Sequence, residues 1–549
     1  MHYNINVFSR YLNHFPKEYS PSNQQIKLIK GVERAFNSGK KFVICCAPTG
    51  SGKSFLAKTL SGLSSGPAEK FIESIKSYSA YKQDYSGNYI NEIDCLSQPP
   101  FGTFALTITK SLQDQYLSLF PDTDILKGKS NYICDVDQNF DVETAPCVLV
   151  PKIRDECWEK NRCPYYNARN TSMLSKFAVL NYKMFLALPS HIKRKNFIIC
   201  DEASELEDEL IKRFSADVIY DRLKNYGIDF KTLITDNREK TRAWIYELIF
   251  NISESINTLI NRANKKQRTL SQPEKIKLQY LKNLHNSLTT VDGLWKDCEY
   301  VIDKDSKKVT FTPLRVEKLT KFVFDYAENV LLMSATIIDH KNFAKNLGIK
   351  DYEYVEVDSD FDAQKSPIYV SSKNKLNYKN LTNVLPAICD QIKTIVDHHQ
   401  TEKGIIHTHS REITNILKVK LGTNKRFLFR DELSNNEDIL KEHYESDFPT
   451  ILVSPSLAYG VDLKDHLARF QIIVKLPFPP LSSKHIKKLF DLDKEWYENK
   501  MLNTLVQACG RATRSKNDFS TTYILDGNIV NTLKRVKNKL PKYFIDRIN

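Results

Sequence analysis

The sequence predicts an α/β protein built as two lobes, each a parallel β-sheet flanked by helices. Short apolar runs typical of strands alternate with helical stretches in both halves of the chain. A glycine-rich segment and an acidic pair each follow such a run in the first half, and two arginines occur near the end of the second half. The predicted strands are 42–46, 104–107, 178–180 and 197–200 in the first lobe, and 404–407, 450–453 and 472–476 in the second. We expect the glycine-rich segment, the acidic pair and the two arginines to meet around one ligand between the lobes.

The segment 47–54, APTGSGKS, is predicted to bind the phosphates of a nucleoside triphosphate. It follows the apolar run 42–46 and precedes a helical stretch, which is the context this motif requires. Glycines let the backbone curl so that successive N–H groups face phosphate oxygens. Lys53 is expected to reach the β- and γ-phosphates, and Ser54 to bind Mg²⁺. The predicted cofactor-binding residues are Pro48, Thr49, Gly50, Ser51, Gly52, Lys53 and Ser54.

Asp201 and Glu202 follow the apolar run 197–200 and are predicted to act in catalysis. A carboxylate at the end of a strand can hold Mg²⁺, and its neighbour can orient an attacking water molecule. We therefore expect Asp201 to hold the metal ion and Glu202 to orient the water. The acidic residues that follow, between 205 and 209, are expected to form a solvated surface.

Length and charge narrow the classes of protein further. The chain has 549 residues, which predicts three or four domains, and a net charge of +14, which suits a polyanion such as nucleic acid. The basic clusters at 262–282 and 534–539 fit a solvated helix face as well as a nucleic-acid contact. No apolar stretch is long enough to span a membrane, and residues 1–15 lack the pattern of a signal peptide. We expect a cytoplasmic protein that is not secreted, of prokaryotic or viral origin.

Four of the 11 cysteines cluster between the phosphate-binding segment and Asp201: Cys134, Cys147, Cys157 and Cys163. Four thiolates in such a segment can hold Zn²⁺ or an iron–sulfur cluster. Structural zinc sites commonly use cysteine pairs separated by about two to four residues, and this segment has no such pair. The spacing gives a modest preference for an iron–sulfur cluster and leaves zinc open.

Several segments resemble the XPD/DinG family of superfamily 2 iron–sulfur DNA helicases, and the resemblance extends from about residue 20 to the C-terminal region. KGKSNYIC at 127–134, CPYYNAR at 163–169 and AVLNY at 178–182 are similar to the segments around that family's cysteines and ahead of its Asp-Glu motif. The other similar segments are 107–115 (motif Ia), 334–336 (motif III), 404–410 (motif IV), 456–463 (motif V), 476–480 (a further signature) and 507–514 (motif VI).

The resemblance implies two RecA-like P-loop helicase lobes, with ATP, Mg²⁺ and an iron–sulfur cluster of the 4Fe–4S type as cofactors. It implies an iron–sulfur domain at 120–175. The long helical insertion, whose apolar stripes begin at Ile245 and Leu281, would be an arch domain at 205–312. The first lobe would comprise 1–119, 176–204 and 313–338, and the second lobe 339–549. Residues 64–100 form a further polar insertion with no predicted role.

Carried over by position, motif VI implies catalytic roles for Gln507, Arg511 and Arg514. The two arginines would stabilise charge on the transferring γ-phosphoryl group. The family often has histidine where this chain has Ser204, which leaves open how that position couples hydrolysis to movement.

The resemblance also implies contacts to nucleotide and nucleic acid. Adenine would be contacted by Gln24, although Gln25 remains an alternative, and motif V would add Gly460 and Asp462 to the nucleotide site. The implied nucleic-acid contacts are Thr107, Thr109, Gln113, Gln115, Thr408 and Ser410. The tyrosines 132, 165 and 166 would either stack on bases or support the cluster.

The function implied is an ATP-dependent DNA helicase that moves 5′ to 3′ on single-stranded or forked DNA as a monomer. Two alternatives remain. One is a translocase that remodels protein–DNA complexes without unwinding. The other is a zinc-stapled scaffold that binds nucleic acid and has an idle ATP pocket.

Overall fold

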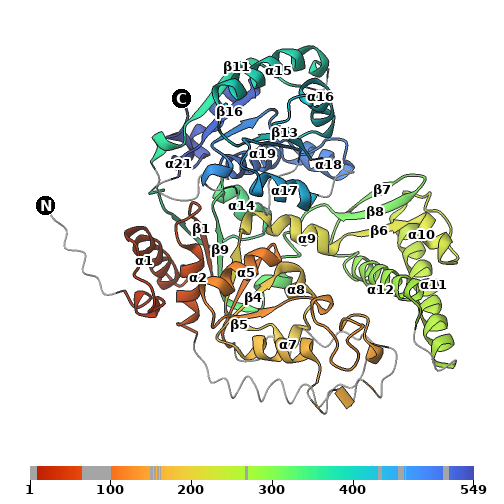
Figure 1. Ribbon diagram of the computed structural model, residues 1–549. Helices are drawn as coiled ribbons and strands as arrows, with labels where there is room; N and C mark the ends of the chain where they lie inside the picture. The colour runs from red at the N-terminus through yellow and green to blue at the C-terminus, as the bar shows by residue number, and fades with distance from the viewer. Residues whose placement is uncertain are drawn as a thin grey trace.

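The structure is a computed structural model, and it describes residues 9–64, 100–148, 153, 156–157, 160, 162–265, 270–360, 362–377, 379–430, 436–455, 463, 465–510 and 518–549. In Figure 1 one parallel sheet with its helices lies above another, and a helical insertion projects at the right of the lower one. The fold class is therefore the predicted α/β architecture with two parallel-sheet lobes. Among the described helices, none combines the length and apolar character needed to cross a membrane.

The first sheet has seven parallel strands in the order β10-β1-β9-β5-β2-β4-β3. Its central strands are buried on both faces, which explains why they read as continuous apolar runs rather than alternating patterns. The strands are β1 (Phe42–Cys46), β2 (Thr103–Thr107), β3 (Asp124–Leu126), β4 (Phe177–Asn181), β5 (Lys195–Asp201), β9 (Ala327–Ser334) and β10 (Glu353–Glu356). The sequence predicts that the first lobe ends at residue 338, but β10 lies past that residue and pairs with β1. The prediction did not include it because its short half-buried run resembles a surface segment.

Two groups of helices cover the two faces of this sheet. Alternate residues of β1 show the division, since Val43 and Cys45 join one core and Ile44 and Cys46 join the other. The first face carries α1 (Asn23–Asn37), α2 (Lys53–Ser61) and α5 (Lys110–Leu119). The second carries α7 (Pro164–Leu174), α8 (Tyr182–Ala187), α9 (Leu206–Phe214), α13 (Lys321–Phe324) and α14 (His340–Asn346).

The second sheet has six parallel strands in the order β11-β16-β15-β12-β14-β13. These are β11 (Ile368–Asn374), β12 (Gly404–His407), β13 (Phe427–Phe429), β14 (Ile451–Ser454), β15 (Phe470–Ile473) and β16 (Thr521–Asp526). One core holds α15 (Leu381–His398) and α16 (Arg411–Leu421), and another holds α19 (Lys494–Cys509), α20 (Asn528–Val536) and α21 (Lys542–Ile545). The remaining helices of this lobe are α17 (Asn436–Glu445) and α18 (Lys484–Leu492).

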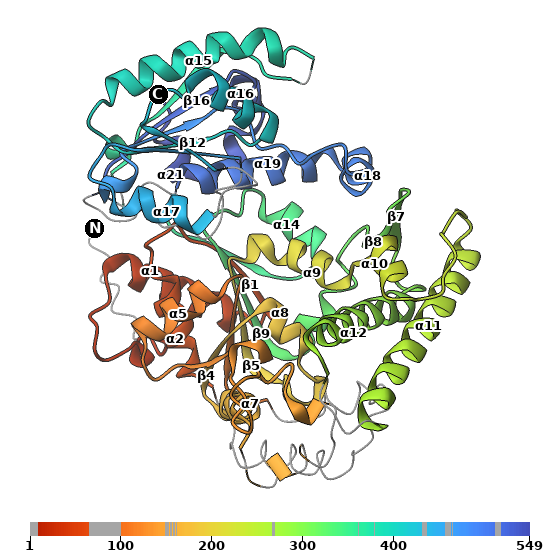
Figure 2. The same ribbon diagram turned by 45° about the vertical axis from the view of Figure 1, so that its right-hand side comes forward.

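The insertion after α9 combines helices with a small sheet. The apolar stripes that predict helices lie on α11 (Arg238–Lys265) and α12 (Gln272–Gly293), which pack together and extend to the side in Figure 2. Beside α10 (Tyr220–Asn225) is an antiparallel sheet that the sequence analysis missed, with the order β6 (Ala216–Ile219), β8 (Lys308–Pro313) and β7 (Tyr300–Lys304). These strands are short. Only residues 305–307 separate β7 from β8, whereas α10, α11 and α12 separate β6 from β7 in sequence.

Short 3₁₀ segments complete the described structure. They are η1 (Leu12–His14), η2 (Lys129–Asn131), η3 (Pro146–Val148), η4 (Ser190–Ile192), η5 (Ala203–Glu205), η6 (Ala363–Lys365), η7 (Asp465–Leu467) and η8 (Lys537–Lys539).

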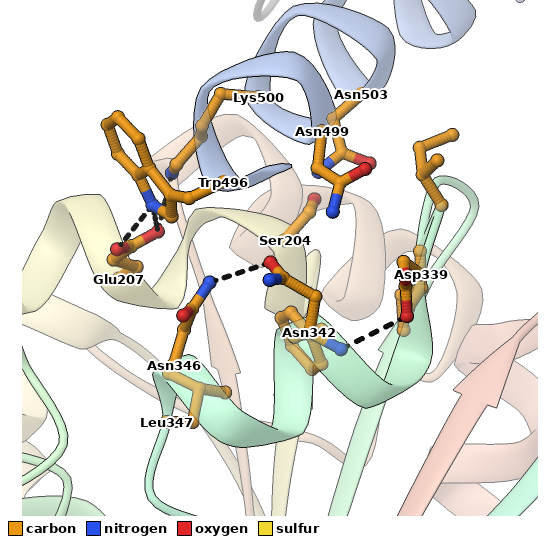
Figure 3. Close-up of a pocket in the computed structure, with 13 residues that line it drawn as sticks. Ser204, Glu207, Asp339, Asn342, Asn346, Leu347, Trp496, Asn499, Lys500 and Asn503 are labelled. Atoms are coloured by element: carbon orange, nitrogen blue, oxygen red, sulfur yellow. Dashed lines mark hydrogen bonds and ion pairs between the residues drawn. The ribbon is translucent and has the colours of Figure 1, made fainter. Parts of the chain in front are cut away.

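The lobes meet along one face of α19, where buried charges from the two lobes pair. Figure 3 shows Trp496 donating from its indole N–H to the Glu207 carboxylate, at 2.9 and 3.1 Å. The Lys500 ammonium lies 3.0 Å from a carboxylate oxygen of Glu207 and 3.0 Å from one of Asp208. Burial alone acts to lower the pKa of Lys500, but the carboxylates of Asp208 and Glu207 outweigh it and hold that pKa above its ordinary value.

A polar cavity lies beside these ion pairs. It is lined in part by Ser204, Asn342 and Asn346 of the first lobe and by Asn499 and Asn503 of α19. The amide nitrogens of Asn342 and Asn499 have no hydrogen-bond partner among the described residues. Buried amides of this kind normally bind water, so this part of the lobe contact is polar rather than a packed apolar core.

Replacing Lys500 with Met is expected to lower the free energy of unfolding by about 3 kcal/mol, because two carboxylates would stay at the lobe contact without their buried cation. The effect is measured by urea-induced unfolding. Lys345→Met is the matched control, since Lys345 also pairs across the lobes, with Asp493 at 3.4 Å, but its side chain is 63% exposed. The control is expected to cost less than about 1 kcal/mol. Equal losses in the two variants would contradict the role given to the buried pairs.

Candidate nucleotide site between the lobes

The predicted phosphate-binding segment forms a tight loop between the buried strand β1 and helix α2. Gly50 and Gly52 have φ of 80° and 89°, in the left-handed region that favours glycine. The Ser51 hydroxyl is buried and has no hydrogen-bond partner among the described residues. The Lys53 ammonium donates to the carbonyls of Ala47 and Pro48, at 3.0 and 3.2 Å. An unpaired buried hydroxyl, a curled backbone and a helix N-terminus together fit a phosphate group.

The two candidate adenine glutamines point to different neighbours. The amide of Gln24 donates to the Asp358 carbonyl at 2.7 Å. The side chain of Gln25 completes the N-terminal cap of α1 with Ser22 and lies against the phosphate loop, where a Cβ on Gly52 would approach its Cγ to 2.5 Å. The structure thus places Gln25 beside the loop and commits the Gln24 amide elsewhere, while adenine contact by either stays a prediction.

Asp201 and Glu202 lie at the carboxyl end of β5, in the middle of the first sheet. Burial, and after it the Glu202 carboxylate, raise the pKa of Asp201 to about 6, while Lys53 acts in the opposite direction. The Asp201 oxygens each accept one hydrogen bond, Oδ2 from the Tyr116 hydroxyl at 3.0 Å and Oδ1 from the Glu202 N–H at 3.0 Å. Asp201 and Ser54 fit a bound Mg²⁺, because both present oxygen ligands near Lys53.

Glu202 has a strained backbone, with φ of 52° in a residue that is not glycine. Such a conformation costs about 1–3 kcal/mol and persists only where the surroundings hold it. The strain turns the chain sharply from β5 into η5. As a result Glu202 is placed at the same sheet edge as Asp201.

A hydrogen-bonded path runs from Glu202 to the second lobe. The Ser334 hydroxyl donates to the Glu202 carboxylate at 3.4 Å and lies 3.0 Å from the Ser204 hydroxyl. The Gln507 amide, near the end of α19, donates to Ser204 at 3.3 Å and to Thr336 at 3.1 Å. Ser204 therefore joins the acidic pair to α19, a link that the sequence left open at this position.

Three of the residues predicted to contact nucleic acid have buried side chains, and their contact with nucleic acid stays a prediction. Gln113 is fully buried, and its amide donates to the carbonyls of Leu126 and Val179, both at 3.1 Å. The side chains of Thr107 and Thr408 are also fully buried. A motif match identifies these positions but does not reveal which way each side chain points.

The other three predicted contacts remain accessible. Gln115 is exposed on α5. Thr109 is the N-cap of α5 and accepts the Leu112 N–H, and Ser410 is the equivalent N-cap of α16 and accepts the Ile413 N–H. Each lobe thus presents one capped helix N-terminus just past the carboxyl end of a central strand. Gly460, Asp462, Arg511 and Arg514 lie outside the described residues.

The four clustered cysteines are neighbours with free thiols. Burial raises the pKa of Cys147, and the thiols of Cys157, Cys134 and Cys163 raise it further. Within the described parts of the chain, however, no group of three or more His, Cys, Asp or Glu side chains is arranged to hold a metal ion. The sulfur atoms thus lie close enough to influence one another, without forming a closed metal site.

The tyrosines around these cysteines divide between the two predicted roles. Tyr165 is buried and pairs edge-on with Tyr132 and Tyr166, at ring distances of 5.7 and 5.3 Å. Burial assigns Tyr165 to support of the segment. Tyr166 is less buried and carries the Arg169 guanidinium over its ring, 4.7 Å from the centroid.

The amino-acid sequence of this chain is similar to those of known helicases. Residues 396–547 match the family model described as a helicase C-terminal domain. A probable ATP-dependent helicase of Methanocaldococcus jannaschii is 23% identical over 78% of this chain and 85% of its own length. The ATP-dependent DNA helicase CHL1 of Kluyveromyces lactis is 29% identical over 24% of this chain, and the match spans only 19% of that relative.

Solved structures show the same fold. An XPD helicase superposes with a TM-score of 0.59 at 17% identity, covering 93% of this chain and 96% of its own. The chain thus has the fold of an XPD helicase, a segment that matches a helicase C-terminal domain, and sequence similarity to proteins named ATP-dependent helicases.

Proposed function

We propose that this chain is an ATP-dependent DNA helicase that moves 5′ to 3′ along single-stranded DNA and works as a monomer with an iron–sulfur cluster. The observation that carries the proposal is the hydrogen-bonded path from Glu202 through Ser334 and Ser204 to Gln507. It connects the residue placed to orient water with the second lobe, as a motor needs if hydrolysis is to move one lobe against the other. The DNA substrate is supported by relatives that are named DNA helicases.

In this proposal Lys53 and the loop N–H groups hold the phosphates, and Ser54 and Asp201 hold Mg²⁺. The ion, when bound, would neutralise charge on the phosphate oxygens. Glu202 orients the attacking water, and Ser334 holds its carboxylate in place. Arg511 and Arg514, which follow α19 in sequence, would supply positive charge from the second lobe.

An iron–sulfur cluster held by Cys134, Cys147, Cys157 and Cys163 is part of this proposal, and the influence of the other three thiols on Cys147 supports it. Such a cluster would cross-link the segments that carry these cysteines. Residues around it offer a basic, aromatic surface, since the Lys129 ammonium lies over the rings of Tyr165 and Tyr166. That chemistry suits a single strand tracked by phosphate contacts and stacking.

The capped N-termini of α5 and α16 suit the phosphate backbone of that strand. Helix N-termini carry partial positive charge and unpaired N–H groups. One such terminus in each lobe, at Thr109 and Ser410, gives two contact points whose separation changes when the lobes move. Stepping along DNA requires two such points.

The decisive test is unwinding of duplexes that carry a 5′ or a 3′ overhang, with ATPase measured on the same preparation. Unwinding only from the 5′ overhang is expected. ATPase stimulated by DNA without strand separation, but with displacement of bound protein, would favour the translocase. A colourless preparation that contains zinc and no iron, with no DNA-stimulated ATPase, would favour the scaffold.

Lys53→Ala is expected to abolish ATP hydrolysis and to leave DNA binding within about twofold, because the ammonium belongs to the proposed phosphate site and not to the surface proposed to bind DNA. ATPase rate and DNA affinity are measured in parallel. Lys40→Ala is the control, since Lys40 precedes the same strand but pairs with Asp351 at the surface. Near-normal ATP turnover in Lys53→Ala would remove the assignment of the loop.

Cys163→Ser is expected to reduce unwinding by more than tenfold and ATPase by much less, because the thiol cluster lies apart from the phosphate loop. Iron content and visible absorbance, recorded on protein purified without oxygen, should fall with unwinding. Cys389→Ser removes a single thiol from the core beside α15 and serves as the control. Normal unwinding and unchanged iron in Cys163→Ser would show that this thiol is dispensable.

A further inference from the structure

Tyr116, which the sequence analysis did not single out, places its hydroxyl at the predicted magnesium site. It lies on α5, its side chain is only 2% exposed, and its hydroxyl donates to Asp201 Oδ2 at 3.0 Å. Burial, the largest cause, raises the pKa of the same hydroxyl, whereas the Ser54 side chain acts to lower it. One phenol group thus contacts Asp201 and is influenced by Ser54.

Packing alone does not account for this hydroxyl. The Tyr116 ring lies in the apolar core under α2 and packs against Phe177, with ring centroids 6.1 Å apart. A phenylalanine would fill that core without bringing a polar atom into it. Burying a hydroxyl costs free energy unless it is hydrogen-bonded, and the partner that satisfies it here is Asp201.

The hydrogen bond also fixes the Asp201 carboxylate. Because Oδ1 accepts from the Glu202 N–H while Oδ2 accepts from Tyr116, the plane of the carboxylate is set from both sides. A ligand held in one orientation loses less conformational freedom when it binds an ion. The hydroxyl reaches Asp201 from the face of the sheet that α5 covers. Ser54 follows β1, which is separated from β5 by β9 alone.

We propose that Tyr116 is a positioning residue for magnesium, whose hydroxyl holds the Asp201 carboxylate in the orientation that binds the ion. This inference rests on the proposed nucleotide site. Tyr116 acts through Asp201 rather than as a ligand of the ion.

Tyr182 provides a matched control. Its side chain is fully buried on the opposite face of β5, and its hydroxyl donates to the backbone carbonyl of Asp201 at 3.1 Å. Tyr182→Phe therefore removes a buried hydroxyl from a contact with the same residue, without touching the carboxylate. Any effect common to both variants reports on folding, and an effect confined to Tyr116→Phe reports on the ion.

The experiment uses the full chain and its two variants, Tyr116→Phe and Tyr182→Phe. Binding of Mn²⁺, as a spectroscopic substitute for Mg²⁺, is titrated by electron paramagnetic resonance in the presence of a non-hydrolysable ATP analogue. Affinity for a fluorescent ATP analogue is measured separately in EDTA, and thermal unfolding checks that the variants fold.

Tyr116→Phe is expected to weaken Mn²⁺ binding about tenfold, the effect of losing a hydrogen bond to a charged group. Its metal-free nucleotide affinity should stay unchanged, and Tyr182→Phe should bind Mn²⁺ within about twofold of the original chain. Unchanged Mn²⁺ binding in Tyr116→Phe, or an equal loss in both variants, would overturn the inference.

The readout separates this inference from the proposed function, because metal binding is measured without hydrolysis. If the original chain binds Mn²⁺ with the analogue but hydrolyses no ATP, the motor proposal fails while the role of Tyr116 can still hold. If the original chain binds no Mn²⁺–nucleotide at all, both proposals fall.

Discussion

The ion pairs between Lys500 and the carboxylates of Glu207 and Asp208, of which only the Glu207 pair is largely buried, help to fix how the two lobes meet. Charges taken out of water are tolerated only when each finds its partner, so these groups define one arrangement of α9 against α19. α9 begins just after Asp201 and Glu202, and α19 ends just after Gln507. The same contact therefore aligns the acidic pair of the first lobe with the motif VI segment of the second.

The rest of the lobe contact is mixed, in contrast to the interior of each lobe. Val301 and Leu314 pack against Leu489 and Trp496 across it, and polar groups lie beside them. Large apolar cores lie within each lobe, on the two faces of its own sheet. Between the lobes lie the Ser204–Gln507 hydrogen bond and a cavity lined with asparagines. Hydrogen bonds of this kind can be replaced by hydrogen bonds to water at a small net cost in free energy. Separating an apolar core costs more, because it exposes apolar surface to water. A lobe contact that is partly polar can therefore shift at lower cost than a continuous apolar core could.

The sequence predicted most of the central strands of the two large sheets but not the details of the site. Central parallel strands are buried on both faces, so runs such as 42–46 and 404–407 are visible without any tertiary information. β6, β7 and β8 were missed because they are short, and β10 was missed because it is only half-buried. The role of an acidic pair after a buried strand follows from local context, and so does that of a glycine-rich loop before a helix.

Side-chain orientation could not be predicted in the same way. Gln113 occupies a motif position yet faces the interior, because its amide satisfies two carbonyls at the sheet edge. Tyr116 carries no motif signal, since its partner Asp201 lies 85 residues away in sequence and becomes a neighbour only when β2 pairs with β5. Contacts made across a sheet leave no periodicity in the chain.

Helix α5 connects the proposed nucleic-acid surface to the proposed magnesium site. Thr109 caps its N-terminus, where a phosphate of nucleic acid would bind, and Tyr116 lies two turns farther along, against Asp201. A helix is stiff over that length because every turn is hydrogen-bonded. If a bound strand moves the N-terminus of α5, the hydroxyl that orients the Asp201 carboxylate moves with it. Occupancy of the nucleic-acid surface would then alter the geometry of the metal ligands through a single rigid element.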